Sequence, residues 1–121
     1  MAWEVEFTDE FEEWWETLSE ANQGKVDARV GLLMERGPNL GFPFSSQAKT
    51  SRFPEMRELR AQAGGDPLRI LYAFDPHRTA ILLVAGDKTG DGRWYEKNVP
   101  VADMLFERHL NTIEKERAEH G

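Results

Sequence analysis

Hydrophobic side chains recur with two different periods along the first third of the chain. Residues 3–7 alternate aromatic or aliphatic side chains with glutamates, which predicts a short strand with one buried face, at or near a sheet edge. Asp9 followed by Glu12 is a variant of the capping box, and it precedes an apolar stripe with the spacing of an amphipathic helix. The stripe consists of Phe11, Trp14, Trp15 and Leu18. We assign both tryptophans to packing, because the helical spacing accounts for them.

A second helix follows in the pattern, and the two helices form a hairpin. Ser19 or Asn22 can cap this helix, and Gly37 with Pro38 ends it. Its apolar positions are Val26, Val30 and Leu33. Residues 37–54 contain three prolines and show no sustained period, so we expect a long loop there.

Three strands are predicted next, over residues 56–63, 68–75 and 79–86. Short breaks rich in turn-forming residues separate them, which predicts an antiparallel meander. Residues 80–85 are apolar at every position, and we expect their strand to be central in the sheet.

A final helix is predicted from Pro100, which suits the first turn of a helix. Its apolar stripe includes Ala102, Leu105, Phe106, His109, Leu110 and Ile113. The polar residues 116–121 are expected to fray. The order of elements predicts one α+β domain over residues 1–121, with a mainly antiparallel sheet, an N-terminal helical hairpin and a C-terminal helix. We expect the helices to pack on one face of the sheet.

The amino-acid composition excludes several classes of protein for this chain. A chain of 121 residues is long enough for one domain that is stable without cross-links. It contains no cysteine, which excludes a disulfide framework, a thiolate zinc site and a catalytic thiol. The longest apolar run, residues 80–85, is far shorter than the roughly 18 residues of a membrane span. The first residues are acidic, unlike an export signal, so we expect a cytoplasmic protein that makes no contact with a membrane.

The net charge of −7 is spread unevenly. Residues 1–46 carry three basic and ten acidic side chains, whereas residues 47–97 carry nine basic and seven acidic ones. Because a site depends on the side chains that share one surface, the middle third is where an anionic ligand is expected.

Basic residues are spread over the three central strands and their ends. They are Arg57, Arg60, Arg69, Arg78 and Lys88. Neighbouring strands lie about 4.8 Å apart, so side chains from several strands can converge on one phosphate. Arg69, between two apolar neighbours, is either such a ligand or a charge on a solvated face, and Arg60 has the same two interpretations. Arg57 can instead pair with Glu55 or Glu58.

The loop that carries Lys88 spans residues 86–92 and is rich in aspartate and glycine. It lacks the glycines of a phosphate loop, and it matches a calcium loop only in part, so an ordinary turn is the favoured interpretation. A calcium-sensitive binding domain is the weaker alternative. The histidines lack metal-site spacing, and His109 is expected to be a packed helix residue. We therefore predict no metal and no cofactor.

Trp94 and Tyr95 lie close to Arg93 and Lys97 at the expected end of a strand. An aromatic side chain beside cations can stack on a base of single-stranded RNA. Closure of the core is the equally good alternative for this pair.

Five sequence blocks, taken in order, resemble the phage-derived, HigB-like branch of the RelE toxin superfamily. They are GPNLGFP (37–43), ELR (58–60), RILYAFDP (69–76), ILLVAGDKTGD (81–91) and WYEKNVPVADMLFERHL (94–110). The resemblance implies the compact RelE-like fold and a toxin of a type II toxin–antitoxin pair. Such toxins cut mRNA at the translating ribosome without a metal. Their partner is a helix-turn-helix antitoxin, HigA-like in this branch, through which any contact with DNA is indirect.

The resemblance also assigns roles to residues. Cleavage by the 2′-hydroxyl on its own phosphate needs a base, an acid and positive charge for the transition state. Arg60 and Arg69 are implied as phosphate ligands, and Lys88 as charge stabiliser or general acid. Contacts with RNA are expected at Arg57, Arg78, Tyr95 and Lys97. The chain departs from the family in its acidity, and a non-enzymatic interaction or inhibitor protein of the same fold remains the alternative.

Overall fold

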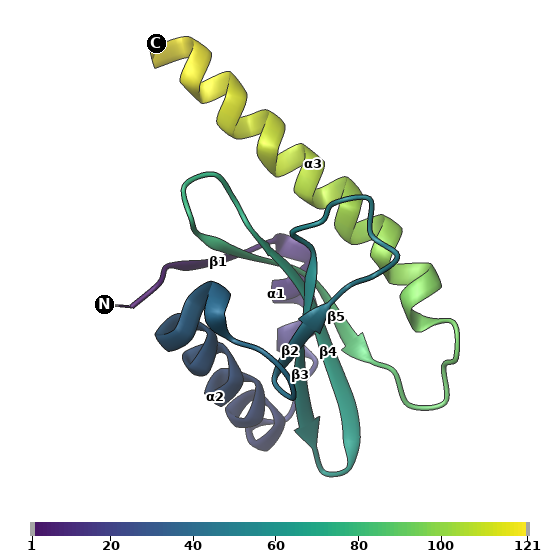
Figure 1. Cartoon of the computed structure of the whole chain (residues 1–121). Helices are drawn as coiled ribbons and strands as arrows, with labels where there is room; N and C mark the ends of the chain where they lie inside the picture. Colours follow the sequence, from purple (N-terminus) through teal and green to yellow (C-terminus); the bar gives the residue numbers. More distant parts are fainter. Residues whose placement is uncertain (1, 121) are drawn as a thin grey trace.

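A sheet of five strands runs through the part of the chain that the computed structural model describes, residues 2–120 (Figure 1). The elements in chain order are β1 (Val5–Phe7), α1 (Asp9–Glu16), α2 (Glu20–Arg36), the 3-10 turn η1 (Gly37–Asn39), β2 (Ser45–Gln47), β3 (Arg57–Ala63), β4 (Asp66–Phe74), β5 (Ala80–Asp87) and α3 (Trp94–His120). The strand order is β1-β5-β4-β3-β2. Strands β2 to β5 pair antiparallel, and β1 pairs parallel with β5 at the edge. This arrangement confirms the α+β class, the meander and the edge position of the first strand.

The middle position of the sheet belongs to β4, while β5 lies between β4 and β1. Both strands are buried along most of their length. The expectation that residues 80–85 form an interior strand is therefore correct, although the strand at the centre is its neighbour.

Helices cover both faces of the sheet, so the expectation of helices on one face is wrong (Figure 1). On one side α1 and α2 pack against a core that includes Leu59, Ile70 and Leu82. On the other side α3 packs against Leu71 and Leu83. The physical reason is that β4 and β5 are apolar at consecutive positions, which point to opposite faces, and both faces must then be covered.

The ends of the first two helices are fixed by short polar side chains. Thr8, and not Asp9, caps α1: its hydroxyl accepts a hydrogen bond from the Phe11 N–H at 3.0 Å and donates one to the Leu83 carbonyl at 2.7 Å. Of the two candidates for α2, Ser19 is the cap. Both caps satisfy donors that the first turn of a helix leaves without partners.

Two elements differ from the sequence prediction in extent. The segment expected to be one long loop contains β2, whose three residues are too short to show a period. Helix α3 begins at Trp94, so Pro100 lies inside it and not in its first turn. The helix tolerates this proline because its first turns pack on the sheet. Within these turns the Asn98 side chain also donates to the Trp94 carbonyl at 2.8 Å. The expected frayed tail is helical to His120, and residue 121 lies outside the described residues.

The first strand is less buried than its alternation predicts. Val5 is half-buried, but the Phe7 side chain is 57% exposed. Phe7 faces an open groove between β1, α1 and α2, so no element covers it. Across residues 2–120, no helix has the length and apolar character needed to cross a bilayer.

Candidate phosphate-binding site

Two arginines face each other across neighbouring strands at one end of the sheet. Arg60 on β3 is the register partner of Arg69 on β4, and Arg69 in turn lies opposite Gly86 on β5. Both arginines alternate with core residues of the α1 and α2 face, so they point to the face that α3 covers in part. Like charges directly opposite each other destabilise a sheet, so this pair needs compensation.

Glu58 supplies that compensation. Its Oε1 lies 3.4 Å from Arg60 Nε and 3.8 Å from Arg69 Nε, and it accepts a hydrogen bond from Ser46 Oγ at 3.1 Å. The carboxylate is buried, with a side chain 8% exposed. It therefore holds two guanidinium groups close together without cancelling their combined charge.

Arg69 is buried, which rules out the interpretation of a charge on a solvated face. The residue is 6% exposed, and its Nη1 donates to the Leu68 carbonyl at 3.0 Å. Its Nε has no hydrogen-bond partner. A buried donor left unpaired costs about 1–3 kcal/mol, so this arginine carries unused capacity to bind an anion. Arg60 is more accessible, with 29% of its side chain exposed.

The start of α3 brings an aromatic side chain beside the arginines. Trp94 is buried against Gly86, where a Cβ atom would lie 2.6 Å from the indole Nε1. Trp94 therefore closes the core, and Tyr95 is the partly exposed member of the pair. Burial raises the pKa of the Tyr95 phenol, and the neighbouring Glu58 carboxylate raises it further, against an opposing effect of Arg69. The phenol thus keeps its proton at neutral pH.

Lys88 completes the group of residues that the structure brings together. It follows β5 directly, and its ammonium nitrogen lies 5.4 Å from the centroid of the Tyr95 ring. We call Glu58, Arg60, Arg69, Lys88 and Tyr95 the arginine site.

Three other basic residues expected to contact RNA are held elsewhere. Arg57 points to the opposite face of β3, where its Nε donates to Ser45 Oγ at 3.0 Å. The alternative of a pairing with Glu55 or Glu58 is not among its contacts within residues 2–120. Arg78 lies at the far end of the β4–β5 hairpin, with its guanidinium 4.6 Å from the Trp3 ring centroid.

Lys97 on α3 has its ammonium 3.2 Å from the Asp91 carboxylate. A hydrogen bond from the Arg93 N–H is the main cause that lowers the pKa of Asp91, and Lys97 lowers it further. In the same loop Asp87 accepts a hydrogen bond from the Thr89 N–H at 2.8 Å. The loop carboxylates therefore hold the loop together, as in an ordinary turn rich in aspartate and glycine.

His109 is the packed helix residue that its spacing predicts, because its Nε2 lies 2.9 Å from Asp75 Oδ2. Within residues 2–120, no group of three or more His, Cys, Asp or Glu side chains is arranged to hold a metal ion.

Two residues near the arginine site were missed by the sequence analysis. Glu58 was considered only as a partner of Arg57, although it shares a strand face with Arg60. Arg29 on α2 lies in the acidic third of the chain, where the charge pattern gives no reason to expect an anion ligand. Its guanidinium carbon is 4.7 Å from the Phe44 ring centroid. The signal that could have found it is its position three residues after Val26, on the inner side of the helix.

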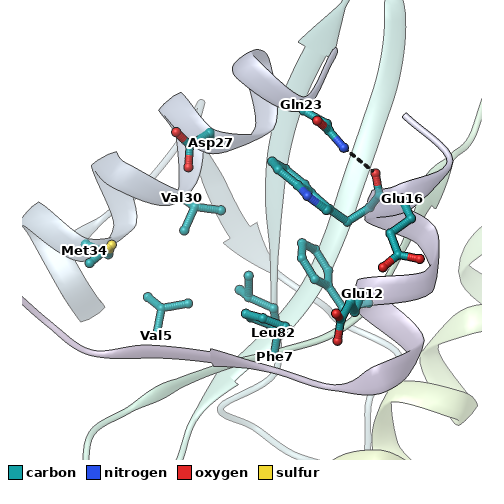
Figure 2. Close-up of a pocket in the computed structure, with 11 residues that line it drawn as sticks. Val5, Phe7, Glu12, Glu16, Gln23, Asp27, Val30, Met34 and Leu82 are labelled. Carbon is teal, nitrogen blue, oxygen red and sulfur yellow. Dashed lines mark hydrogen bonds between the residues drawn. The ribbon is translucent and has the colours of Figure 1, made fainter. Parts of the chain in front are cut away.

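The largest described cavity lies elsewhere, between β1, α1 and α2 (Figure 2). It measures about 530 Å³, and Val5, Val30 and Leu82 contribute to its apolar floor. Figure 2 also shows three carboxylate side chains around it, those of Glu12, Glu16 and Asp27. We call this cavity the acidic groove. Its charge would repel a phosphate, so it does not compete with the arginine site as a place for RNA.

The fold defines the class of protein. Over 89% of this chain and 98% of the other, the structure is similar to that of an arginine-to-alanine mutant of the E. coli toxin RelE in the free state, with a TM-score of 0.56. The sequences are only 11% identical, so this likeness establishes the RelE-like fold.

The sequence defines the family within that class. The family described as "Phage derived protein Gp49-like (DUF891)" matches residues 13–107, and the chain belongs to it. The chain is 41% identical to "Putative toxin HigB3" of Mycobacterium tuberculosis over 111 residues, which cover 91% of this chain and 90% of the relative. It is 40% identical to "Putative toxin HigB2" of the same organism over 84% of this chain and 51% of that longer protein. The protein is thus a homologue of HigB toxins with a RelE-like fold, as the sequence blocks indicate.

Proposed function

We propose that this protein is the toxin of a type II toxin–antitoxin pair, and that it cuts mRNA on the ribosome in the cytoplasm by a metal-independent reaction. The observation that carries the proposal is the buried Arg69 beside Arg60, with an unpaired donor, in a homologue of HigB toxins. A chain with a net charge of −7 has little general attraction for RNA, so its contacts with phosphate must come from a local cluster of this kind.

The proposed reaction is an intramolecular transesterification. The RNA 2′-hydroxyl loses its proton and attacks the adjacent phosphorus, the bond to the 5′-oxygen breaks, and that oxygen takes up a proton. The products are a 2′,3′-cyclic phosphate and a 5′-hydroxyl end. Negative charge builds on the non-bridging oxygens in the transition state, and fixed cationic donors are the groups that stabilise it.

Each residue of the arginine site has a role in this proposal. Arg60 and Arg69 bind the scissile phosphate and stabilise the transition state, since guanidinium groups match its oxygen geometry. Lys88 adds charge or protonates the departing 5′-oxygen. Tyr95 donates a hydrogen bond, because its raised pKa keeps the phenol protonated. Glu58 is a positioning residue that holds the two guanidinium groups.

The partner in the proposed pair is a helix-turn-helix antitoxin, and we assign its contact to the acidic groove. An apolar floor with carboxylates around it fits a basic amphipathic helix. Met34 in this groove is 37% exposed, and Met104 on α3, outside the groove, is 52% exposed. Met34→Asp should leave growth arrest in place when the antitoxin is co-expressed, whereas Met104→Asp should still be neutralised. Neutralisation of both variants would refute the assignment.

Mapping transcript 5′-ends after induced expression in a bacterial host tests the nuclease. The wild type is compared with Arg69→Ala/Lys88→Ala, and with Lys115→Ala/Arg117→Ala as a control that removes the same charge from the exposed end of α3. We expect new cuts within translated frames for the wild type and the control, and none for the site variant.

Other results would decide against the nuclease. Growth arrest without new 5′-ends would favour the non-enzymatic inhibitor, with the arginines as its docking surface. Unaltered cutting by a folded Arg69→Ala/Lys88→Ala protein would remove the residue assignment while leaving the activity.

A further inference from the structure

Two buried donors without hydrogen-bond partners belong to arginines that line the same cavity. Among residues 2–120, the buried side-chain nitrogens and oxygens that lack a hydrogen-bond partner are Nε of Arg29 and Nε of Arg69. Both arginines line a cavity of about 300 Å³ at the edge of β3, and Arg60 lines it too. Buried polar groups are nearly always paired, so two orphans that share one cavity indicate that a ligand supplies their acceptor.

Arg29 reaches this cavity from a different element than the other two arginines. It lies on α2, while Arg60 and Arg69 lie on β3 and β4. The cavity lies just before β2 begins: its first residue, Ser45, pairs with Leu59, and the next β3 residue, Arg60, donates its N–H to the carbonyl of the preceding Phe44. The loop residues Pro43 and Phe44 form the remaining wall beside β3.

The contact with Phe44 prepares Arg29 for an anion. Its guanidinium carbon is 4.7 Å from the centre of the ring. Stacking of this kind uses the face of a guanidinium and leaves its N–H groups, which lie in the plane, free to donate. No ion pair of Arg29 is found within residues 2–120. Its charge is therefore available to a ligand.

The three arginines also carry more charge than their surroundings compensate. Glu58 lies within 4 Å of Arg60 and Arg69 and is the acidic side chain in contact with them in the described part of the chain. Three cations against one carboxylate leave a net positive site in an acidic protein. An anion with several acceptor oxygens satisfies both orphan donors and this charge at once.

We propose that Arg29 binds a second RNA phosphate, the one next to the scissile phosphate, so that the RNA backbone runs from Lys88 across Arg69 and Arg60 to the edge of the sheet. This inference rests on the proposed function, because it takes the arginine site as the place of cleavage. It adds a contact between a helix residue and an RNA phosphate to the phosphate contacts that the strand residues make.

Binding of a single-stranded oligonucleotide with 2′-O-methyl groups tests the inference without cleavage. Affinity is measured by fluorescence anisotropy at several salt concentrations, for the wild type, Arg29→Gln, Arg29→Lys and Arg36→Gln. Arg36 is the matched control because it lies on the same helix and is exposed. We expect Arg29→Gln to weaken binding about tenfold and to reduce the salt slope by about 0.7, the contribution of one contact with a single-stranded phosphate.

The other two variants and a second ligand show whether Arg29 contributes charge, hydrogen-bond geometry or neither to the binding of RNA. Arg29→Lys should keep the salt slope and lose part of the affinity, because lysine retains the charge but not the fork of donors. Arg36→Gln should behave as the wild type. Thermal unfolding of each variant shows that binding is compared between folded proteins. Titration with inorganic phosphate alone separates a free anion from an RNA backbone.

Three results would overturn the inference. The first is that Arg29→Gln and Arg36→Gln bind the oligonucleotide equally well. The second is that the wild type does not bind the oligonucleotide at low salt. The third is that Arg29→Gln loses binding of inorganic phosphate but binds the oligonucleotide as the wild type does. None of them depends on cleavage. Failure of the nuclease proposal would instead leave the oligonucleotide contact in place while no new transcript ends form in cells.

Discussion

Replacing Arg69 by methionine separates a role in binding from a role in folding. The substitution keeps an unbranched side chain of similar length and removes the guanidinium group. If Arg69 serves the fold, the protein loses stability. If it serves a phosphate, the protein loses activity and keeps its stability, because the arginine is poorly satisfied in the free protein.

The contacts of Arg69 allow the change in stability to be estimated. The variant loses one hydrogen bond, to the Leu68 carbonyl, worth about 1 kcal/mol. It is relieved of the unpaired buried Nε, a gain of about 1–3 kcal/mol, and of the like charge opposite, a gain of about 0.2–1 kcal/mol. Loss of the ion pair at 3.8 Å to Glu58 offsets part of this gain, although Glu58 keeps Arg60 and Ser46 as partners.

Before the offset from Glu58, these contributions place the free energy of unfolding about 0–3 kcal/mol above that of the wild type, so the Tm of Arg69→Met should not fall. The effect on cleavage is far larger. Removing one fixed donor from a transition-state oxyanion lowers the rate by about a hundredfold or more.

The assay combines thermal unfolding with cleavage of a defined mRNA on purified ribosomes, followed by mapping of 5′-ends. Arg57→Met is the control, because Arg57 lies three residues before Arg60 on the opposite face of β3 and donates to Ser45. We expect this control to lose about 1 kcal/mol of stability and to keep full cleavage. A loss of 3–5 kcal/mol in Arg69→Met, as when a buried ion pair is broken, with unchanged cleavage per folded molecule would refute the reasoning.

Other contacts lead to four further predictions. Thr8→Ala removes a hydroxyl that caps α1 and donates to β5, so the free energy of unfolding measured in urea should fall by about 1–2 kcal/mol. Gly86→Ala places a Cβ 2.6 Å from the Trp94 indole and should displace the start of α3, seen as a changed tryptophan emission and lower cleavage. The pKa of the Tyr95 phenol is raised in the folded protein, so the protonated phenol stabilises the fold. This stabilisation is complete below the ordinary pKa near 10 and is lost as pH rises through the raised pKa. Stability should therefore fall more steeply at alkaline pH in the wild type than in Tyr95→Phe. Glu58→Gln should move that phenol titration, followed by ultraviolet absorbance against Tyr95→Phe, back toward its ordinary range.

The sequence alone determined the elements and their order, because periodicity is a local property. The apolar stripes of α1 and α2 and the three strands of the meander follow from spacing of residues that are close in the chain. The same local information placed Arg60 and Arg69 on neighbouring strands and Lys88 just past the next one. It also produced the resemblance to HigB-like toxins, which the 41% identity to "Putative toxin HigB3" confirms, and the expected RelE-like fold, which the structural similarity confirms.

The sequence predictions fail at elements whose extent depends on partners distant in the chain. The start of α3 at Trp94 is stabilised by packing against Gly86, which overrides the local signal of Pro100. The three residues of β2 are a strand only because β3 lies beside them. Spacing could not show that Glu58 and Arg69 would be buried together.

The tertiary structure alone decided which cations share a site. Alternation along β3 sends Arg57 and Arg60 to opposite faces, and the sheet register then sets Arg60 against Arg69. Arg29, 31 positions before Arg60, joins them because α2 packs against β3. Charge summed along the sequence pointed away from that helix, whereas a phosphate responds to the charges within a few ångströms of it. Local pattern therefore specifies the elements, and only folding specifies which side chains face the same ligand.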